Sequence, residues 1–437
     1  MTDPTMPRSV RFLGALLLTQ DADRRILEGN LRIEDGRITH VGPEPVPEAD
    51  RTVDAHRFVL APGFVNAHTH VAMGPLRGAV DDRDLGAFLD KLFRLDAKRT
   101  DSDLEIGAEQ GITEMLLSGT TSFLDLYYGE DAVARAVDRL GIRGFLGWAV
   151  LDPELTTQKG RPLDNAREFI GRWKGHPRVT PLVAPQGVYV CNAETWLGAR
   201  ELAEASNTFV HCHLSETRRE VHEHEAKYGM RPPAWLDSIG ALPPGLVAAH
   251  AVWLTAAEVR LLGERQVGVA HCPGSNMKLA TGGVCPVPEL KGAGVPIGLG
   301  TDSVASNNSL SMLREMHLAG LLQKHHRWDA AVLPAQELLD MATRTGARLL
   351  GREADLGSLE VGKQADLVLY RRDHPTLAPA RPEAIVSHLA FSASEEAVDS
   401  VFVAGREVVR HRELLGRPWE EIRAEAETAA ARLWAEG

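Results

Sequence analysis

Short apolar runs that alternate with longer amphipathic stretches are the feature that most constrains the fold of this chain. Eight such runs follow one another, at residues 64–68, 120–126, 142–149, 179–184, 208–213, 246–250, 267–271 and 296–300. Apolar residues recur near i, i+3 and i+4 in stretches between them, at residues 102–118, 131–139, 193–205, 219–229, 255–264 and 310–326. Strands that alternate with helices are typical of a parallel sheet, and eight such units predict an α/β fold, a (β/α)8 barrel of the TIM type.

The two ends of the chain have a different pattern. Residues 31–41 and 398–409 alternate between apolar and polar side chains around a turn that contains glycine, Gly36 in the first and Gly405 in the second. This pattern predicts two β-hairpins, which we expect to belong to one small β-sandwich module. The expected division is 1–59 with 357–437 for this module, including a helix at 419–435, and 60–356 for the catalytic barrel.

Composition narrows the class of protein. The formal net charge of -12 leaves no basic face for a phosphate backbone, so we expect no nucleic acid partner. No stretch approaches the ~18 apolar residues of a membrane span. The apolar run at 12–18 is short and lacks a cleavage site, which favours a strand over a signal peptide. The 4 cysteines are too few for a disulfide scaffold, and we expect a cytoplasmic protein.

Candidate metal ligands lie at the ends of the predicted strands. His68 ends the first run with His70 just beyond it, His213 ends the fifth run, and Asp302 follows the eighth. The carboxyl ends of barrel strands meet at one face, where the active site lies. We therefore expect these side chains to converge. Neutral imidazoles with one carboxylate suit one Zn²⁺ ion, with Fe²⁺ or Mn²⁺ as alternatives.

Three more titratable residues follow the same rule. His250 ends the sixth run, His271 ends the seventh, and Glu216 comes three residues after His213. A single buried histidine is ordinarily a packed core residue, but repetition at several strand ends favours a functional cluster. His211 lies on the same face as His213 if both belong to one strand. The spacing to Glu216 favours His213 as the ligand.

This constellation resembles the amidohydrolase superfamily, through motifs at 62–70 (PGFVNAHTH), 211–217 (HCHLSET) and 300–302 (GTD). Further stretches are similar to the methylthioadenosine/S-adenosylhomocysteine deaminase branch, whose close relatives include triazine chlorohydrolases. These stretches lie at 249–254, 271–279 and 306–309, and the tail motif at 357–367 also resembles the family. The resemblance implies one divalent metal held by His68, His70, His213 and Asp302.

The resemblance also implies roles in catalysis. Superfamily members with two metals carry a lysine at the end of strand four, and the run at 179–184 has none, so one metal is expected. A bound divalent ion lowers the pKa of water toward about 7. Asp302 and His250 are expected to receive the proton of that water, and Glu216 to protonate the ring nitrogen beside the attacked carbon before ammonia leaves.

Several residues that are expected to contact the substrate differ from those at the matching positions of the deaminase branch. Where adenosine-type members have a Trp followed by a Glu, the nearest matches are Phe88 and Asp96. Gln186 replaces a histidine after strand four, and Trp148 replaces an arginine associated with the homocysteine carboxylate. Together with His271, these are the candidate substrate-binding residues. Trp148 argues against S-adenosylhomocysteine and is compatible with an apolar 5' group.

The leading hypothesis is a mononuclear-metal aminohydrolase that deaminates an adenine nucleoside such as 5'-methylthioadenosine, 5'-deoxyadenosine or adenosine. The alternatives are a deaminase of another aminated heterocycle, of the guanine, cytosine or pterin type, and a triazine hydrolase. A third hypothesis, a non-catalytic barrel that serves assembly, is disfavoured because no metal ligand is lost. The expected partner is a small heterocyclic substrate, and the resemblance favours a homodimer or homotetramer.

Overall fold

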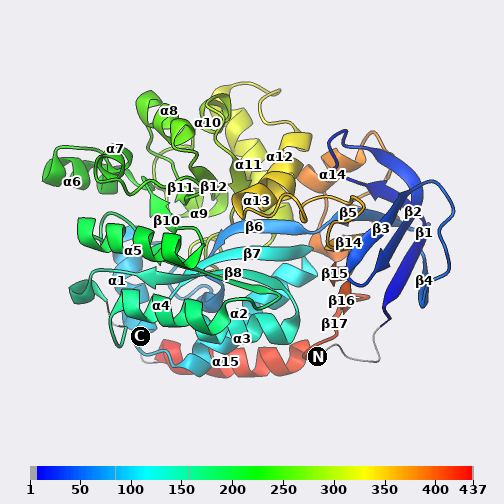
Figure 1. Ribbon diagram of the computed structural model, residues 1–437, viewed down its shortest axis with the longest axis horizontal. Helices are drawn as coiled ribbons and strands as arrows, with labels where there is room; N and C mark the ends of the chain where they lie inside the picture. Colours follow the sequence, from blue (N-terminus) through cyan, green and yellow to red (C-terminus); the bar gives the residue numbers. More distant parts are fainter. Residues whose placement is uncertain (1–6, 84, 157, 436–437) are drawn as a thin grey trace.

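A computed structural model describes residues 7–83, 85–156 and 158–435 and has an α/β architecture (Figure 1). All eight strands expected between residues 64 and 300 are present. They are β6 Phe64–Thr69, β7 Thr120–Tyr127, β8 Arg143–Val150, β9 Val179–Pro185, β10 His211–Leu214, β11 Val247–His250, β12 Gly268–His271 and β13 Ile297–Leu299. Nearly every residue in them is buried, as expected for parallel strands covered by helices.

These strands form two four-stranded parallel sheets, β6-β7-β8-β9 and β10-β11-β12-β13. Val183 of β9 forms a parallel bridge with Val210, which precedes β10. At the opposite edges, the amide of Asp302, just beyond β13, donates to the carbonyl of His68 in β6 at 2.9 Å. The two sheets therefore adjoin at both pairs of edges, and the carboxyl ends of β6 and β13 lie together.

Helices follow the expected pattern between the strands. The expected ones are α2 Asp101–Leu117, α3 Glu130–Leu140, α5 Ala193–Ser206, α6 Arg218–Tyr228, α8 Ala256–Glu264 and α11 Met312–Arg327. Thr100, Thr217 and Thr255 begin α2, α6 and α8 with a capping box, in which the threonine and an acidic residue three positions on satisfy each other's backbone amide. Among the described helices, none is long and apolar enough to cross a bilayer.

Both ends of the chain meet in one hydrogen-bonded sheet of nine strands, here called the chain-end sheet (Figure 1). Its strands are β1 Ser9–Leu18, β2 Ile26–Glu34, β3 Arg37–Gly42, β4 Arg51–Asp54, β5 Phe58–Pro62, β14 Leu367–Arg371, β15 Val398–Val403, β16 Arg406–Arg410 and β17 Glu413–Leu414. Both predicted hairpins are confirmed, with Asp35, Gly36, Ala404 and Gly405 at positive φ, as two-residue turns of this type require. A sandwich arrangement of this sheet stays a prediction.

The C-terminal helix, α15 Trp419–Ala435, forms where expected but does not lie beside the chain-end sheet. In Figure 1 it runs beneath α2 and α3. Arg432 of α15 forms an ion pair with Asp103 of α2, and the indole N–H of Trp434 donates to the carbonyl of Pro75 at 3.0 Å. The buried side of α15 carries Ile422, Ala426, Ala429 and Leu433. This apolar stripe is buried against the helical layer rather than against strands.

Candidate metal centre

The structure brings the predicted metal ligands together at the carboxyl ends of the strands. The ligand atoms of His68, His70 and Asp302 all lie within 4.8 Å of one another, and so do those of His68, His213 and His250. His68 lies in β6, His213 in β10 and His250 at the end of β11, whereas His70 and Asp302 lie in the loops after β6 and β13. One cluster therefore joins both parallel sheets.

Two of the imidazoles have their orientation fixed by backbone carbonyls. Nδ1 of His70 donates to the carbonyl of Leu126, and Nδ1 of His213 donates to that of Gln186 at 2.7 Å. A neutral ring in either position then has its lone pair on Nε2. The two Nε2 atoms lie only 3.3 Å apart. Lone pairs facing each other at this distance repel unless a cation lies between them, so the arrangement fits a metal ion.

His68 offers a third nitrogen. Its Nε2 is buried and has no hydrogen-bond partner, whereas its Nδ1 lies 2.8 Å from Nε2 of His211. Burial lowers the pKa of His68 to about 4, so the ring is neutral. An unpartnered buried nitrogen is costly unless it binds something. Both nitrogens of His211 are already engaged, Nε2 with Nδ1 of His68 and Nδ1 with the carbonyl of Val247, which agrees with the choice of His213 as the ligand.

Asp302 completes the donor set. Its Oδ1 lies 3.2 Å from Nε2 of His70 and 3.6 Å from Nε2 of His68. Ser275 Oγ donates to Oδ2 at 2.6 Å, and the amide of Ser303 donates to Oδ1 at 2.7 Å. Burial alone would raise the pKa of Asp302, but contact with the two imidazoles holds it well below its usual value. Three imidazoles and one carboxylate form a set that binds zinc and similar divalent ions.

Glu216 lies just after β10 beside the cluster. Burial, reinforced by the negative charge of Asp302, raises the pKa of Glu216 to about 8, so the carboxyl group is protonated at neutral pH. Its Oε2 lies 3.8 Å from Nε2 of His250. Glu220 accepts the amides of Ser215 and Glu216 at 2.9 and 2.8 Å and so fixes this segment. Glu216 therefore places a buried, protonated carboxyl group beside the cluster.

His250 is held in the opposite tautomer to the ligands. Nδ2 of Asn276 donates to its Nδ1 at 3.0 Å, which leaves the proton on Nε2, facing Glu216. Burial lowers the pKa of His250, so the ring is neutral. His250 also has a φ of 73°, and Asp302 a φ of 58°. Left-handed backbone at non-glycine residues is costly and gathers at functional sites.

The first two candidate substrate residues lie on α1 Leu85–Asp96, and Phe88 is buried there. The carboxylate of Asp96 accepts a hydrogen bond from the hydroxyl of Tyr127 at 2.6 Å and forms an ion pair with buried Arg99 at 3.0 Å. The ring of Tyr127 lies 5.9 Å from that of His70. The charge of Asp96 is therefore balanced by Arg99, and Tyr127 lies between Asp96 and the candidate ligand His70.

The other three candidates lie apart from one another. The indole of Trp148 packs against Phe169 of α4 Pro162–Trp173 at 5.6 Å and donates to Gln158 at 2.9 Å, so it is directed toward the helical layer rather than the ligands. Gln186 is at the site through its carbonyl, which orients His213. His271 is buried with both ring nitrogens unpartnered, and burial lowers its pKa to about 3.

Three residues that hold the site in place were not expected from the sequence: His211, Ser275 and Asn276. Ser275 and Asn276 fall in α9 Pro273–Lys278, directly after β12. The rule that functional side chains follow the strand ends would have indicated this segment. His211 was visible as a histidine two residues before a ligand, but its contact with His68 depends on a strand 143 residues away.

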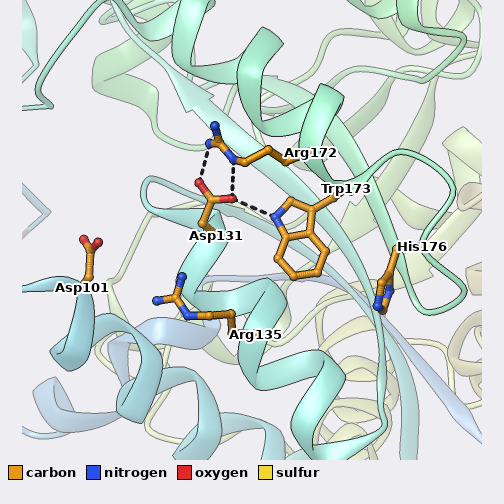
Figure 2. Close-up of a pocket in the computed structure, with 6 residues that line it drawn as sticks. All are labelled: Asp101, Asp131, Arg135, Arg172, Trp173 and His176. Atoms are coloured by element: carbon orange, nitrogen blue, oxygen red, sulfur yellow. Dashed lines mark hydrogen bonds and ion pairs between the residues drawn. The ribbon is translucent and has the colours of Figure 1, made fainter. Parts of the chain in front are cut away.

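A separate cavity of about 620 Å³ lies among the outer helices α2, α3 and α4 (Figure 2). Arg172 and the indole N–H of Trp173 both bind Asp131 there, and Arg135 pairs with Glu105. Both arginines that line the cavity are therefore already paired with carboxylates, and its lining lacks the convergent imidazoles of the metal cluster.

The chain matches the amidohydrolase family over residues 59–408. It is 42% identical over 412 residues, 93% of this chain and 95% of the relative, to a 5-methylthioadenosine/S-adenosylhomocysteine deaminase of Desulforudis audaxviator. A 5'-deoxyadenosine deaminase of Methanothermobacter thermautotrophicus is 40% identical over 429 residues, 97% of this chain and 99% of the relative. A solved structure of an adenosine deaminase from Xanthomonas campestris with bound zinc has a TM-score of 0.93 at 33% identity and covers 98% of each chain. This chain therefore belongs to the amidohydrolase family.

Proposed function

We propose that this protein is a mononuclear-metal aminohydrolase that removes the exocyclic amino group of an adenine nucleoside and releases ammonia. The observation that carries the proposal is the convergence of three imidazoles and one carboxylate beside the protonated carboxyl group of Glu216. The names of the deaminase relatives support the reaction class and the nucleoside substrate.

His68, His70, His213 and Asp302 would hold the metal, and we assign zinc. Imidazole and carboxylate donors suit this ion, and the zinc-bound relative supports it, with Fe²⁺ or Mn²⁺ as the alternatives. When bound, a divalent cation supplies an acidified water whose pKa falls toward about 7.

The side chains of this chain then move the protons. Asp302, ionised and facing the cluster, accepts the proton that the attacking water loses. Glu216 donates a proton to the ring nitrogen beside the amine-bearing carbon, so that negative charge does not build on the heterocycle. His250 presents its Nε2–H and stabilises the developing charge on oxygen. Asp302 then passes this proton to the departing amino group, the C–N bond breaks and ammonia leaves, while the hydroxyl proton on the attacked carbon returns to Glu216 as the oxo group forms.

We infer that the substrate has a small or apolar 5' group, as in 5'-methylthioadenosine, 5'-deoxyadenosine or adenosine. The position that resemblance associates with the homocysteine carboxylate holds Trp148, which is directed toward the helical layer, so this position supplies no cation to the carboxylate of S-adenosylhomocysteine. That nucleoside is therefore expected to be the poorest substrate of the group.

The architecture and assembly complete the proposal. We infer that the eight parallel strands close into one (β/α)8 barrel over residues 60–356, supported by the contacts at both pairs of sheet edges. Residues 1–59 and 357–437 would form the accessory module, with α15 returning to the barrel. A homodimer or homotetramer in the cytoplasm is expected, since closed symmetric assemblies prevail among soluble enzymes.

A substrate panel tests the proposal. The metal-loaded protein is incubated with 5'-methylthioadenosine, 5'-deoxyadenosine, adenosine, S-adenosylhomocysteine, guanine, cytosine, an aminopterin and a chlorotriazine, and released ammonia and chloride are measured. Ammonia from the first three nucleosides is expected. Chloride from the triazine, with no ammonia from any nucleoside, would overturn the proposal.

A further inference from the structure

A second buried histidine stands behind the metal ligand His68. The ring of His211 lies between His68 in β6 and the start of β11, with Nε2 2.8 Å from Nδ1 of His68 and Nδ1 2.8 Å from the carbonyl oxygen of Val247. Both rings are fully buried, and their centroids lie 5.0 Å apart. His211 thus bridges three strands, β6, β10 and β11.

The two hydrogen bonds of this bridge can be donated in only one direction, from His68 to His211 and from His211 to Val247. The carbonyl of Val247 only accepts, so Nδ1 of His211 carries the proton of that ring. The ring of His211 is fully buried, and its nitrogens face a carbonyl and another imidazole rather than a carboxylate that would stabilise a charge, so the ring is neutral and Nε2 has a lone pair. Nδ1 of His68 must therefore donate to it, and Nε2 of His68 is left with a lone pair directed at the cluster.

The other two histidine ligands are held differently. Nδ1 of His70 and Nδ1 of His213 each donate directly to a backbone carbonyl, which no side-chain substitution can remove. Among the described ligands, His68 is the imidazole whose orientation depends on another side chain. Removing the acceptor at position 211 would free the ring of His68 to take the other tautomer, with a proton on the nitrogen that must bind the metal.

We propose that His211 is a positioning residue that selects the metal-binding tautomer of His68 and thereby sets the affinity of the site for its ion. The inference rests on the metal site of the proposed function, but it is independent of the substrate. Its test therefore contains no substrate, and its outcome is separate from that of the deamination assay.

Two variants separate the hydrogen bond from the space that the ring fills. His211→Gln keeps an oxygen that can accept from His68 and an amide that can donate to Val247, whereas His211→Phe keeps the volume and offers neither. His224 provides the control, because it is a buried histidine of α6 whose Nδ1 also donates to a carbonyl, that of Met230 at 2.9 Å. The dissociation constant for zinc is measured by competition with a chelator at neutral pH.

His211→Phe is expected to weaken zinc binding by about 10- to 100-fold, the usual effect of losing a partner that orients a ligand. His211→Gln should stay within a few-fold of the parent, and His224→Phe should match it. Parent affinity in His211→Phe, or equal losses in His211→Gln and His211→Phe, would overturn the proposal.

A measurement on the unaltered chain covers the case in which His211→Phe does not fold. Nitrogen NMR of metal-free protein labelled at histidine reports which ring nitrogen is protonated, with assignments from His211→Gln and His68→Gln. Both His68 and His211 are expected as Nδ1–H tautomers. A proton on Nε2 of His68 would overturn the proposal.

Discussion

His70 and His213 hold their Nε2 atoms 3.3 Å apart, while Nδ1 of each ring donates to a backbone carbonyl. Two neutral rings in this arrangement repel, so the pair is stable only with positive charge between or on them. Burial alone would lower the pKa of His70, but contact with Asp302 raises it above its usual value. Without a metal, His70 therefore binds a proton more readily than a free imidazole does, and this proton and a metal ion compete for Nε2 of His70.

This competition predicts how metal affinity depends on pH. Because His70 must lose its proton before it can bind, the apparent affinity for zinc should fall as pH falls from 8 to 6. Titrations in chelator buffers at pH 8, 7 and 6 measure it. His56→Gln, at an exposed position on the chain-end sheet, should leave the profile unchanged. A zinc affinity that does not vary between pH 8 and pH 6 would contradict the competition between proton and metal at His70.

Replacing the buried acid should separate metal binding from turnover. Glu216→Gln removes the proton donor and none of the metal ligands, so metal content should be retained while turnover falls by about 10²- to 10⁴-fold. His68→Ala should lose both metal and turnover. Metal analysis and ammonia release measure the two effects, and Glu223→Gln, at an exposed position on α6, is the control. Full activity in Glu216→Gln would exclude it as the proton donor.

Docking of α15 on α2 should depend on pH through Asp103. Burial alone would raise the pKa of this carboxyl group, but hydrogen bonds from Arg432 and Thr100 outweigh it and lower the pKa. Such a group stabilises the fold above its unfolded pKa of about 3.9, and this contribution is lost as pH falls through the lower folded value.

Asp103→Asn should therefore lower the urea midpoint at pH 7. Loss of the carboxylate from the capping box of α2 should reduce the free energy of unfolding by about 1 kcal/mol. At pH 3, below the unfolded pKa of about 3.9, the difference from the parent should be smaller. Urea titrations at both pH values measure it, with Asp101→Asn in the same helical turn as the control. A difference that persists unchanged at acid pH would show that the carboxylate charge is not responsible.

A buried ion pair joins the chain-end sheet to the parallel strands. Nη2 of Arg143, at the start of β8, lies 3.1 Å from Oδ1 of Asp366, and the two side chains are 2% and 4% exposed. Arg143→Met leaves the carboxylate buried without its partner and should cost about 3–5 kcal/mol. Metal content should not change, because Arg143 lies at the end of β8 opposite the ligands.

Chemical denaturation and metal analysis measure these two results. Arg8→Met is the matched control, because the ion pair of Arg8 with Asp35 is solvent-exposed and should not affect the midpoint. Equal midpoints for Arg143→Met and the parent would mean that the chain-end sheet is held by packing alone.

The eight parallel strands and the helices α2, α3, α5, α6, α8, α11 and α15 could be predicted because their signal is local. Apolar runs of four to eight residues and capping threonines identify the elements without knowledge of their neighbours. The position of α15 could not be predicted in this way. Its stripe of Ile422, Ala426, Ala429 and Leu433 shows that one face is buried, but not that the partner is α2. The other described helices, α1, α4 and α9 among them, were not predicted.

The convergence of the candidate ligands could be predicted because the carboxyl ends of the strands meet, whereas the residues around them depend on three-dimensional contacts. Alternation places His211 and His213 on one face, but only their depth and the contact with His68 give them different roles. Trp148 occupies a position matched to the family, yet its ring packs against Phe169 of α4 rather than toward the ligands. Asp96 is neutralised by Arg99, a pairing that the family motif did not indicate.

The measurement that tests the central claim most directly is a titration of zinc into metal-free protein with 5'-deoxyadenosine as substrate, followed by ammonia release. One metal site, built from His68, His70, His213 and Asp302, predicts no ammonia from the metal-free protein and a linear rise that ends at about one zinc per chain. Equal ammonia release without metal, or a rise that continues to two equivalents, would contradict a mononuclear metal-dependent deaminase.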